Sequence, residues 1–322
     1  MAKPVYAVEV QGLKKYFGDN KAVDNIDLKI PSGMIYGVLG PNGAGKTTTI
    51  NMLATLLRPD GGTANVFGHD VVHEAQIVRQ LIGVTGQYAS VDEKLSALEN
   101  LIIFGRLLGL SHADAKQKAN ELLEEFGLTE AAKRPLAKFS GGMRRRLDLA
   151  ASLIAQPPLI FLDEPTTGLD PRTRNQMWAT IRRLVKNGST IVLTTQYLEE
   201  ADQLADRIAV IDHGRVVAEG TPNELKKSIG DATLIVGITD KKHIAKTVEI
   251  IESSLKSKSQ QPEPLVVTAP MRDANAVTDL LVKLREAGVV IDELSVQKPT
   301  LDEVFFAITG KPTEHKKGNE NE

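Results

Sequence analysis

The beginning of the chain combines two strand-like patterns with a glycine-rich loop that leads into a helix. Residues 5–10 and 22–30 alternate apolar and polar side chains, and the turn Gly18–Asn20 between them favours antiparallel pairing. The short apolar run Met34–Leu39 leads directly into the glycine-rich loop, and residues 47–57 then have the pattern of a helix. This order of strand, loop and helix is the context that a phosphate-binding loop requires.

The middle of the chain, from about residue 95 to residue 157, has a helical pattern. Two amphipathic segments in it have apolar residues at Leu98, Leu101, Ile102 and Leu108, and at Ala115, Ala119, Leu122, Leu123 and Phe126. Strand patterns return at Leu159–Leu162 and Thr190–Thr194, with a helix near Arg172–Asn187 between them. This order predicts a right-handed β-α-β unit, and residues 208–220 after it predict a hairpin.

A second, smaller unit is predicted to begin near Pro222–Ile229. Strand and helix patterns alternate through it, at Ala232–Ile238, Lys242–Leu255, Leu265–Thr268, Ala274–Ala287 and Val289–Gln297. The polar run Ser257–Pro264 is interpreted as a loop inside this unit, and an amphipathic helix at Leu301–Thr309 closes it.

These patterns predict three regions. Residues 1–225 form a nucleotide-binding domain, with its helical subdomain at about 95–157. Residues 226–310 form a small α+β accessory domain. Residues 311–322 are charged and lack core residues, so we expect a disordered polar tail.

Composition limits the classes of function. The 322 residues carry a net charge of −2, so no basic field is available to recruit nucleic acid or anionic lipid. The absence of cysteine excludes disulfides and thiolate metal sites. The amino terminus lacks the apolar run of a signal peptide, and the longest mainly apolar stretch, Leu149–Leu162, is shorter than the roughly 18 residues that span a bilayer. Any role at a membrane therefore requires a partner.

The glycine-rich loop fits the phosphate-loop pattern at every fixed position. Its glycines permit a tight curve and expose the backbone N–H groups that cradle the α- and β-phosphates. We expect Lys46 to reach the β- and γ-phosphates of ATP and the Thr47 hydroxyl to bind Mg²⁺. The expected nucleotide-binding residues of this loop are Gly40, Pro41, Asn42, Gly43, Ala44, Gly45, Lys46, Thr47 and Thr48.

Two acids follow the buried strand pattern Leu159–Leu162. Asp163 stands at the strand tip, where it can hold Mg²⁺ through water, and Glu164 comes one residue later. We expect Glu164 to polarise the attacking water as a general base, a role worth about 10²–10⁴ in rate. The alternative is a strand that ends in a solvated acidic turn; the phosphate loop earlier in the chain argues against it.

Ser140, Gly141 and Gly142 form a candidate anion site 23 residues before Asp163. A serine followed by two glycines at a helix start offers a hydroxyl and unshielded backbone N–H groups. An anion site this far along the chain from the phosphate loop indicates that two surfaces grip one ATP.

Together these motifs resemble the ATP-binding cassette (ABC) ATPases. The resemblance implies an α/β fold of the P-loop NTPase type, with a RecA-like core, an antiparallel β subdomain and a helical subdomain. It also implies a homodimer in which Ser140, Gly141 and Gly142 reach the γ-phosphate bound by the other protomer, and an integral membrane permease as the partner. No nucleic acid partner is expected.

The resemblance assigns roles to three further residues. Gln87 matches the glutamine that touches Mg²⁺ and follows movement of the membrane partner, although by itself it is an exposed loop amide. Asp170 matches a loop that crosses the dimer seam, and its local alternative is an N-cap for the helix after Pro171. Phe17, 29 residues before Lys46, matches the ring under adenine; Tyr16 and a core role are the alternatives.

Two positions depart from the family pattern. Met143 stands where the signature usually has Gln, and we expect little change because the phosphate contacts come from Ser140 and the glycine backbone. Gln196 stands where the family places a histidine that contacts the γ-phosphate. Its amide can donate a hydrogen bond but cannot become cationic, so we expect slower hydrolysis.

Gln196, the residues after it and the segment Leu301–Phe306 resemble one branch of the family, the ATP-binding subunits of daunorubicin/doxorubicin-resistance type exporters. This resemblance implies an ATPase that powers export of drugs or other hydrophobic compounds. The subunit is then expected at the cytoplasmic face of the cell membrane, held there by its permease.

Two other functions stay open at this point. The first is a soluble ABC-type ATPase in translation or DNA maintenance; against it, the chain has one cassette, and only 94 residues without sustained heptads separate Lys46 from Ser140. The second is a nucleotide-binding regulator without turnover, against which the presence of Glu164 argues.

Overall fold

The computed structural model describes residues 5–85, 91–273 and 275–310. Two of the predicted features lie outside these residues, namely Gln87 and the polar tail at 311–322.

The chain divides into two compact units, Met1–Pro222 and Asn223–Glu322. Each unit has a hydrophobic core of its own, and the first unit has two. Over the part of the chain that the structure describes, no helix combines the length and the apolar character needed to cross a bilayer.

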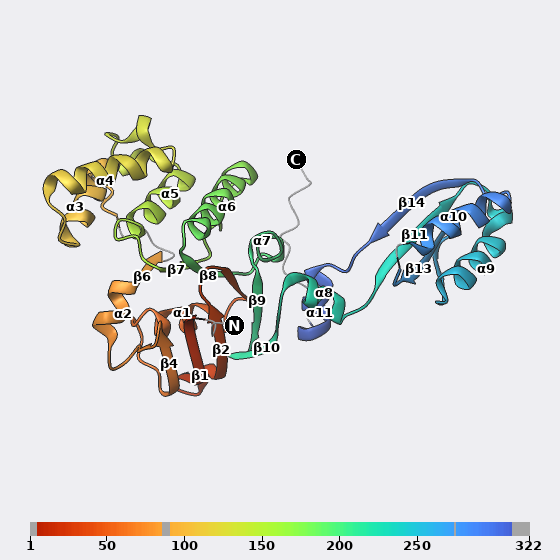
Figure 1. The fold of residues 1–322 in the computed structure, drawn as a ribbon, viewed down its shortest axis with the longest axis horizontal. Coiled ribbons are helices and arrows are strands. Elements are labelled where there is room, and N and C mark those ends of the chain that lie inside the picture. Colours follow the sequence, from red (N-terminus) through yellow and green to blue (C-terminus); the bar gives the residue numbers. More distant parts are fainter. Residues whose placement is uncertain (1–4, 86–90, 274, 311–322) are drawn as a thin grey trace. The chain divides into compact units, whose positions relative to one another are not determined.

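A six-stranded sheet forms the centre of the first unit, in the order β10-β9-β3-β8-β7-β6 (Figure 1). Neighbouring strands pair in parallel except β10, which is antiparallel to β9. The strands are β3 (Ile35–Leu39), β6 (Ile82–Thr85), β7 (Leu159–Asp163), β8 (Thr190–Thr195), β9 (Arg207–Asp212) and β10 (Arg215–Gly220). β3, β7 and β8 are buried along their whole length, because both faces of the sheet are covered.

A second, antiparallel sheet in the order β2-β1-β4-β5 packs on one face of the central sheet. It consists of β1 (Tyr6–Phe17), β2 (Asn20–Pro31), β4 (Gly61–Val66) and β5 (His69–Asp70). Helix α1 (Lys46–Leu53) contributes Ile50 and Leu53 to the core between the two sheets, and α2 (Ala75–Leu81) contributes Val78. The predicted pairing of the first two strands is therefore present, with strands longer than the alternating patterns indicated.

Strand β7 shows how the two cores of this unit share one sheet. Leu159 and Phe161 belong to the core beneath the antiparallel sheet, whereas Ile160 and Leu162 belong to the core on the opposite face. Helices α6 (Pro171–Lys186) and α7 (Leu198–Leu204) cover that opposite face.

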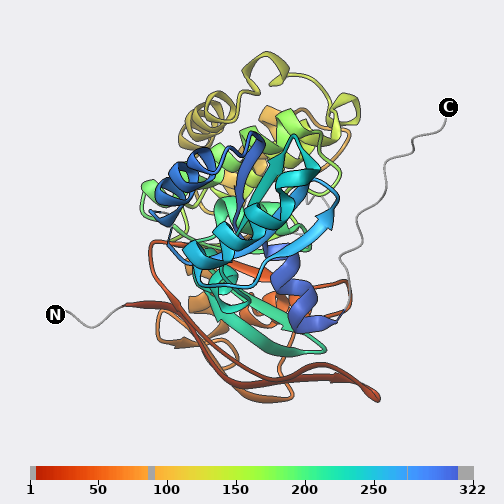
Figure 2. The same ribbon diagram turned by 90° about the vertical axis from the view of Figure 1, so that its right-hand side faces the viewer.

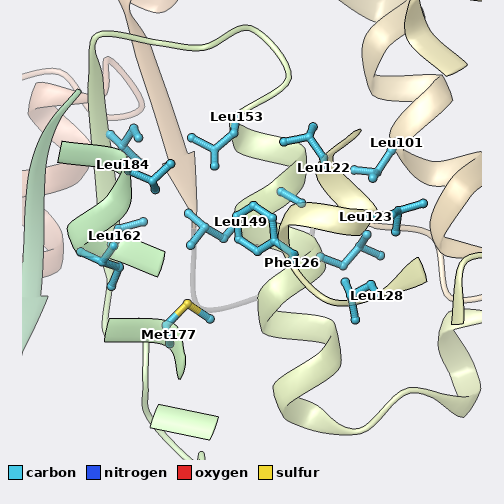
Figure 3. Close-up of a cluster of buried hydrophobic side chains, with 14 of the residues drawn as sticks. Leu101, Leu122, Leu123, Phe126, Leu128, Leu149, Leu153, Leu162, Met177 and Leu184 are labelled. Carbon is cyan, nitrogen blue, oxygen red and sulfur yellow. The ribbon is translucent and has the colours of Figure 1, made fainter. Parts of the chain in front are cut away.

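The helical subdomain continues the second core. It contains α3 (Ala97–Leu107), α4 (His112–Glu125), the short 3₁₀ turns Thr129–Ala131 and Leu136–Lys138, and α5 (Gly141–Ser152). Figure 3 shows Leu101, Leu122, Leu123, Phe126 and Leu149 in one cluster that extends to Leu162, Met177 and Leu184. Both Figure 1 and Figure 2 place this subdomain and the antiparallel sheet at opposite ends of the first unit.

The second unit contains a four-stranded antiparallel sheet in the order β12-β13-β11-β14. Its strands are β11 (Ala232–Ile238), β12 (Gln260–Glu263), β13 (Val266–Met271) and β14 (Ile291–Gln297). Its further elements are the 3₁₀ turn Lys241–His243, α9 (Ile244–Leu255), α10 (Ala276–Glu286), α11 (Leu301–Thr309) and α8 (Pro222–Ser228), whose first residue belongs to the first unit. The order strand, helix, two strands, helix, strand is a split β-α-β arrangement.

One prediction about this unit is wrong. The run Ser257–Pro264, interpreted as a loop, contains β12 at Gln260–Glu263, which pairs with β13 at the edge of the sheet. All four residues of β12 are exposed, so no apolar alternation marks it in the sequence.

Candidate nucleotide-hydrolysis site

The phosphate loop connects the end of β3 to the start of α1. Lys46 is 5% exposed, and its Nζ donates to the carbonyls of Gly40 at 2.8 Å and Pro41 at 3.0 Å. Burial lowers the pKa of this lysine, and the nearby carboxylates of Glu164 and Asp163 work against that shift. The ammonium therefore lies inside the loop, beside two acids that come from a strand far along the chain.

Two glycines of the loop are required by close backbone approach. A Cβ on Gly40 would lie 2.2 Å from the carbonyl oxygen of Ile211, and one on Gly45 would lie 2.2 Å from that of Ala22. Gly45 also has a φ of +105°, which a residue with a side chain rarely adopts. The loop is thus fixed by its neighbours, while Asn42 and Gly43 at its tip are exposed.

Asp163 ties the phosphate loop to two strands of the central sheet. It is 5% exposed, and both of its carboxylate oxygens lie 3.1 Å from Thr47 Oγ1. The Thr194 hydroxyl, from the end of β8, also donates to Oδ1 of Asp163. A hydroxyl and a carboxylate meet here because the carboxyl ends of the parallel strands β3, β7 and β8 lie at one edge of the sheet.

Glu164 directs its carboxylate toward the phosphate loop from a left-handed backbone turn. Its φ is +48°, and its N–H donates to the carbonyl and to the hydroxyl of Thr194, both at 3.1 Å. Oε1 lies 4.0 Å from Nζ of Lys46, and Oε2 accepts from the Thr167 hydroxyl at 3.2 Å. The structure therefore brings together Lys46, Thr47, Asp163 and Glu164, the four residues predicted for phosphate, metal and base.

The Ser140 turn begins helix α5, as the sequence predicts. Ser140 is its N-cap, and the hydroxyl accepts from the Met143 N–H at 3.3 Å. Ser140 and Gly141 are exposed. Among the described residues, no hydrogen bond or ion pair joins Ser140, Gly141 or Gly142 to the phosphate loop of the same chain.

The other predicted residues have mixed local roles. Asp170 is the N-cap of α6, accepting from the Thr173 N–H at 3.0 Å and from its hydroxyl, and these hydrogen bonds lower the pKa of Asp170. Phe17 is 51% exposed at the end of β1, whereas the Tyr16 hydroxyl is committed to Asp24 at 3.0 Å. Gln196 follows the last residue of β8 and is half-buried.

Sequence reasoning missed three residues around the site: Thr194, Arg145 and Glu200. Thr194 is one of several threonines in a strand, where threonine is common, so nothing marks it. Arg145 is one of three consecutive arginines, and its contacts with the end of β7 depend entirely on tertiary structure. Glu200 stands beside the exposed Glu199, and only helical periodicity could have separated the two.

Glu200 is a buried carboxylate that joins three elements. It is 1% exposed, and its Oε1 accepts from the Thr166 hydroxyl at 2.7 Å and from the Trp178 indole N–H at 3.2 Å. The Thr195 hydroxyl is a further partner. Burial raises the pKa of Glu200, and these hydrogen bonds offset part of the effect. Glu200 thereby links the loop after Glu164 to α6 and to the end of β8.

A phosphate loop, an acid pair at a parallel strand end and the P-loop fold define a nucleoside triphosphatase. The ABC transporter family model matches residues 23–167, and the model of the DrrA1-3-like C-terminal domain of ATP-binding proteins matches residues 220–309. A daunorubicin/doxorubicin resistance ATP-binding protein, DrrA, of Streptomyces peucetius is 52% identical over 99% of this chain and 97% of its own length. The doxorubicin resistance ATP-binding protein DrrA of Mycobacterium tuberculosis is 46% identical over 96% and 95%.

A solved structure agrees with this relationship. It is a dimeric post-hydrolysis state of an ATP-binding cassette bound to ADP and Pi, 26% identical, with a TM-score of 0.61 over 66% of this chain and 98% of that one. The chain belongs to the ABC transporter ATP-binding proteins, in the branch of the daunorubicin/doxorubicin-resistance ATPases. The predicted family, fold class and ATPase activity are confirmed, and the alternative role in translation or DNA maintenance gains no support.

Replacing Glu200 by Gln tests its buried charge. A raised carboxyl pKa means that the folded chain favours the protonated form, so the stability from this group is present at low pH and lost as the pH rises above the ordinary carboxyl value. Glu200→Gln cannot ionise. In urea denaturation from about pH 5 to about pH 8, the free energy of unfolding of the wild type should therefore fall relative to that of the variant.

Glu199→Gln is the matched control, because that side chain is 69% exposed and pairs with Arg174. Its stability should follow the wild type at every pH. If Glu200→Gln also followed the wild type throughout, Glu200 would not be the group that ionises.

Proposed function

We propose that the chain is the motor of an exporter for drug-like hydrophobic compounds, and that two copies close on two ATP molecules to drive a separate permease. The observation that carries this proposal is the meeting of Lys46, Thr47, Asp163 and Glu164 at one sheet edge. The resistance relatives, which align over almost their whole length, support the class of cargo.

The phosphate loop supplies the nucleotide contacts. Its backbone N–H groups bind the α- and β-phosphates, and Lys46, already among the loop carbonyls, exchanges them for the β- and γ-phosphates. The exposed ring of Phe17 stacks on adenine, a contribution of about 1–3 kcal/mol by analogy with base stacking on aromatic side chains.

The same edge of the sheet suits a magnesium ion. The Thr47 hydroxyl and the Asp163 carboxylate offer oxygen atoms, the ligands that Mg²⁺ prefers. Asp163 is the carboxylate that contacts the Thr47 hydroxyl, and a site with one such protein ligand fits an ion that also binds phosphate oxygens. When bound, Mg²⁺ neutralises charge that develops on the β- and γ-phosphates. Gln87 stays a predicted further ligand.

Glu164 acts as the general base. Its carboxylate is 11% exposed and lies beside Lys46, so it faces the predicted position of the γ-phosphate. It takes the proton of the attacking water, while Gln196 at the end of β8 donates a hydrogen bond to the phosphate.

The second half of each nucleotide site comes from the sister protomer. The exposed N-terminus of α5 carries Ser140, Gly141 and Gly142, a geometry suited to the γ-phosphate. Asp170, exposed at the start of α6, lies at the dimer seam in this arrangement. The dimeric state of the solved relative supports it.

A groove between β6, α3 and α5 suits the permease. It encloses about 710 Å³, and Leu107 and Leu108 at its rim are 77% and 55% exposed. Adjacent exposed leucines beside a groove favour this surface as the docking site for the permease. The end of β6 lines the groove, and Gln87, which the family resemblance ties to movement of the membrane partner, comes two residues later in the sequence. Docking there holds the subunit at the cytoplasmic face of the membrane.

Two variants test hydrolysis. Glu164→Gln should bind ATP, accumulate as a dimer and lose about 10²–10⁴ in turnover, because the amide cannot accept the proton. Lys46→Ala should lose nucleotide binding. Phosphate release and size-exclusion chromatography with ATP measure these effects; undiminished release by Glu164→Gln would remove it from the mechanism.

Gln196→His tests the switch position. Because imidazole can carry charge near neutral pH, this variant should keep or raise turnover in a steady-state ATPase assay. Loss of turnover with normal ATP binding would show that Gln196 does not have the proposed role of a hydrogen-bond donor to the phosphate.

Leu107→Asp tests the groove. The charge should abolish co-purification with the permease from detergent-solubilised membranes, while ATP binding stays normal. Val217→Asp is the control, because Val217 is 43% exposed on β10, at the opposite edge of the central sheet. Unchanged co-purification of Leu107→Asp would place the partner elsewhere.

A further inference from the structure

Three consecutive arginines near the start of α5 contact three different parts of the chain. Nη1 of Arg144 contacts Oε1 of Glu93 at 2.5 Å. Nη1 of Arg146 donates to the carbonyl of Phe126 at 3.0 Å, within the helical subdomain. Arg145 reaches instead to the end of β7, where the acid pair lies.

Arg145 binds three successive backbone carbonyls. Its Nη2 donates to the carbonyls of Asp163 at 2.5 Å and Glu164 at 3.0 Å, and its Nε donates to that of Pro165 at 3.1 Å. Only a guanidinium offers several donors in one rigid plane; a lysine ammonium is a single point on a flexible stem. Burial lowers the pKa of Arg145, and nearby carboxylates, that of Asp148 first, oppose the shift.

These contacts fall on the strained residue of the site. Glu164 has a φ of +48°, a conformation that is unfavourable for a residue with a side chain and persists only where the surroundings enforce it. Thr194 holds the N–H of Glu164, and Arg145 holds its carbonyl. The direction of the carboxylate toward Lys46 therefore depends on both.

The same helix serves two sites. α5 begins at the Ser140 cap, and Arg145 lies five residues later, about one and a half turns along the helix. A displacement of the Ser140 end therefore moves the guanidinium as well, since a helix of this length behaves as a rigid element.

We propose that Arg145 is a positioning residue. Through it, the orientation of the Glu164 carboxylate depends on the position of α5. The proposal rests on hydrolysis through Glu164. When the sister protomer's ATP engages the Ser140 turn, α5 is held and Arg145 keeps the left-handed turn at Glu164. Each protomer then hydrolyses its own ATP efficiently only while its neighbour's site is loaded, so the two sites are coupled.

The experiment compares Arg145→Lys and Arg145→Gln with Arg144→Lys, in the full chain purified with its permease. The Arg145 variants should lose about tenfold or more in kcat, because a small misplacement of a catalytic group is costly. KM for ATP and ATP binding should change less than about twofold, and the Hill coefficient for ATP should fall toward one. Arg144→Lys should match the wild type in all of these.

A second measurement distinguishes a positioning role of Arg145 from an effect of the substitution on the fold as a whole. In the Glu164→Gln background, Arg145→Lys should cause no further loss of residual phosphate release, because the group that it positions is already gone. Rates are expressed per molecule of bound ATP, so misfolded protein does not count.

Each result decides the matter. Wild-type kcat and Hill coefficient in Arg145→Lys, with Glu164→Gln inactive, would overturn the positioning role and leave the proposed function standing. An equal fractional loss in both backgrounds would also overturn it, because Arg145 would then act on the fold as a whole. Full hydrolysis by Glu164→Gln would instead remove the proposed base, and this proposal with it.

Discussion

The site depends on one meeting point, the carboxylate of Asp163 between the hydroxyls of Thr47 and Thr194. These three side chains come from the start of α1 and from the ends of β7 and β8. Because the strands are parallel and buried on both faces, their carboxyl ends share one edge, and a ligand bound there touches all of them. Displacing any one of these elements would separate the phosphate loop from the acids.

Glu164, the residue next to this point, has a strained backbone conformation. Glu164 adopts a left-handed turn, and both of its backbone polar groups are held by other elements, the N–H by β8 and the carbonyl by α5. Glu200 adds a buried tie between the loop that follows and the end of β8. Glu164 is therefore positioned by contacts from β8, from α5 and from the loop that follows it, which is how a strained residue persists in a folded protein.

The helical subdomain is not an independent body in this architecture. Its core continues into the face of the central sheet through Leu162 and Met177, and its last helix carries both the Ser140 turn and Arg145 (Figure 3). The groove at its border exposes leucines on the same unit. In the proposed scheme, α5 and its neighbours therefore connect the permease groove, the nucleotide of the sister protomer and Glu164.

The sequence alone determined the family and its ATPase activity. The phosphate loop, the Asp163-Glu164 pair and the Ser140 turn are local patterns whose residue types follow from phosphate and proton chemistry, so they were recognised without a structure. The edge strand β12 was missed because its four side chains are all exposed and carry no apolar alternation. The roles of Arg145, Thr194 and Glu200 emerged only from the folded chain. Arginine, threonine and glutamate are usual surface or strand residues, and what distinguishes these three is their hydrogen bonds to segments 18 to 34 residues away. Short motifs report on chemistry that neighbouring residues perform together, whereas positioning contacts between distant segments exist only after the sheet has brought its strand ends to one edge.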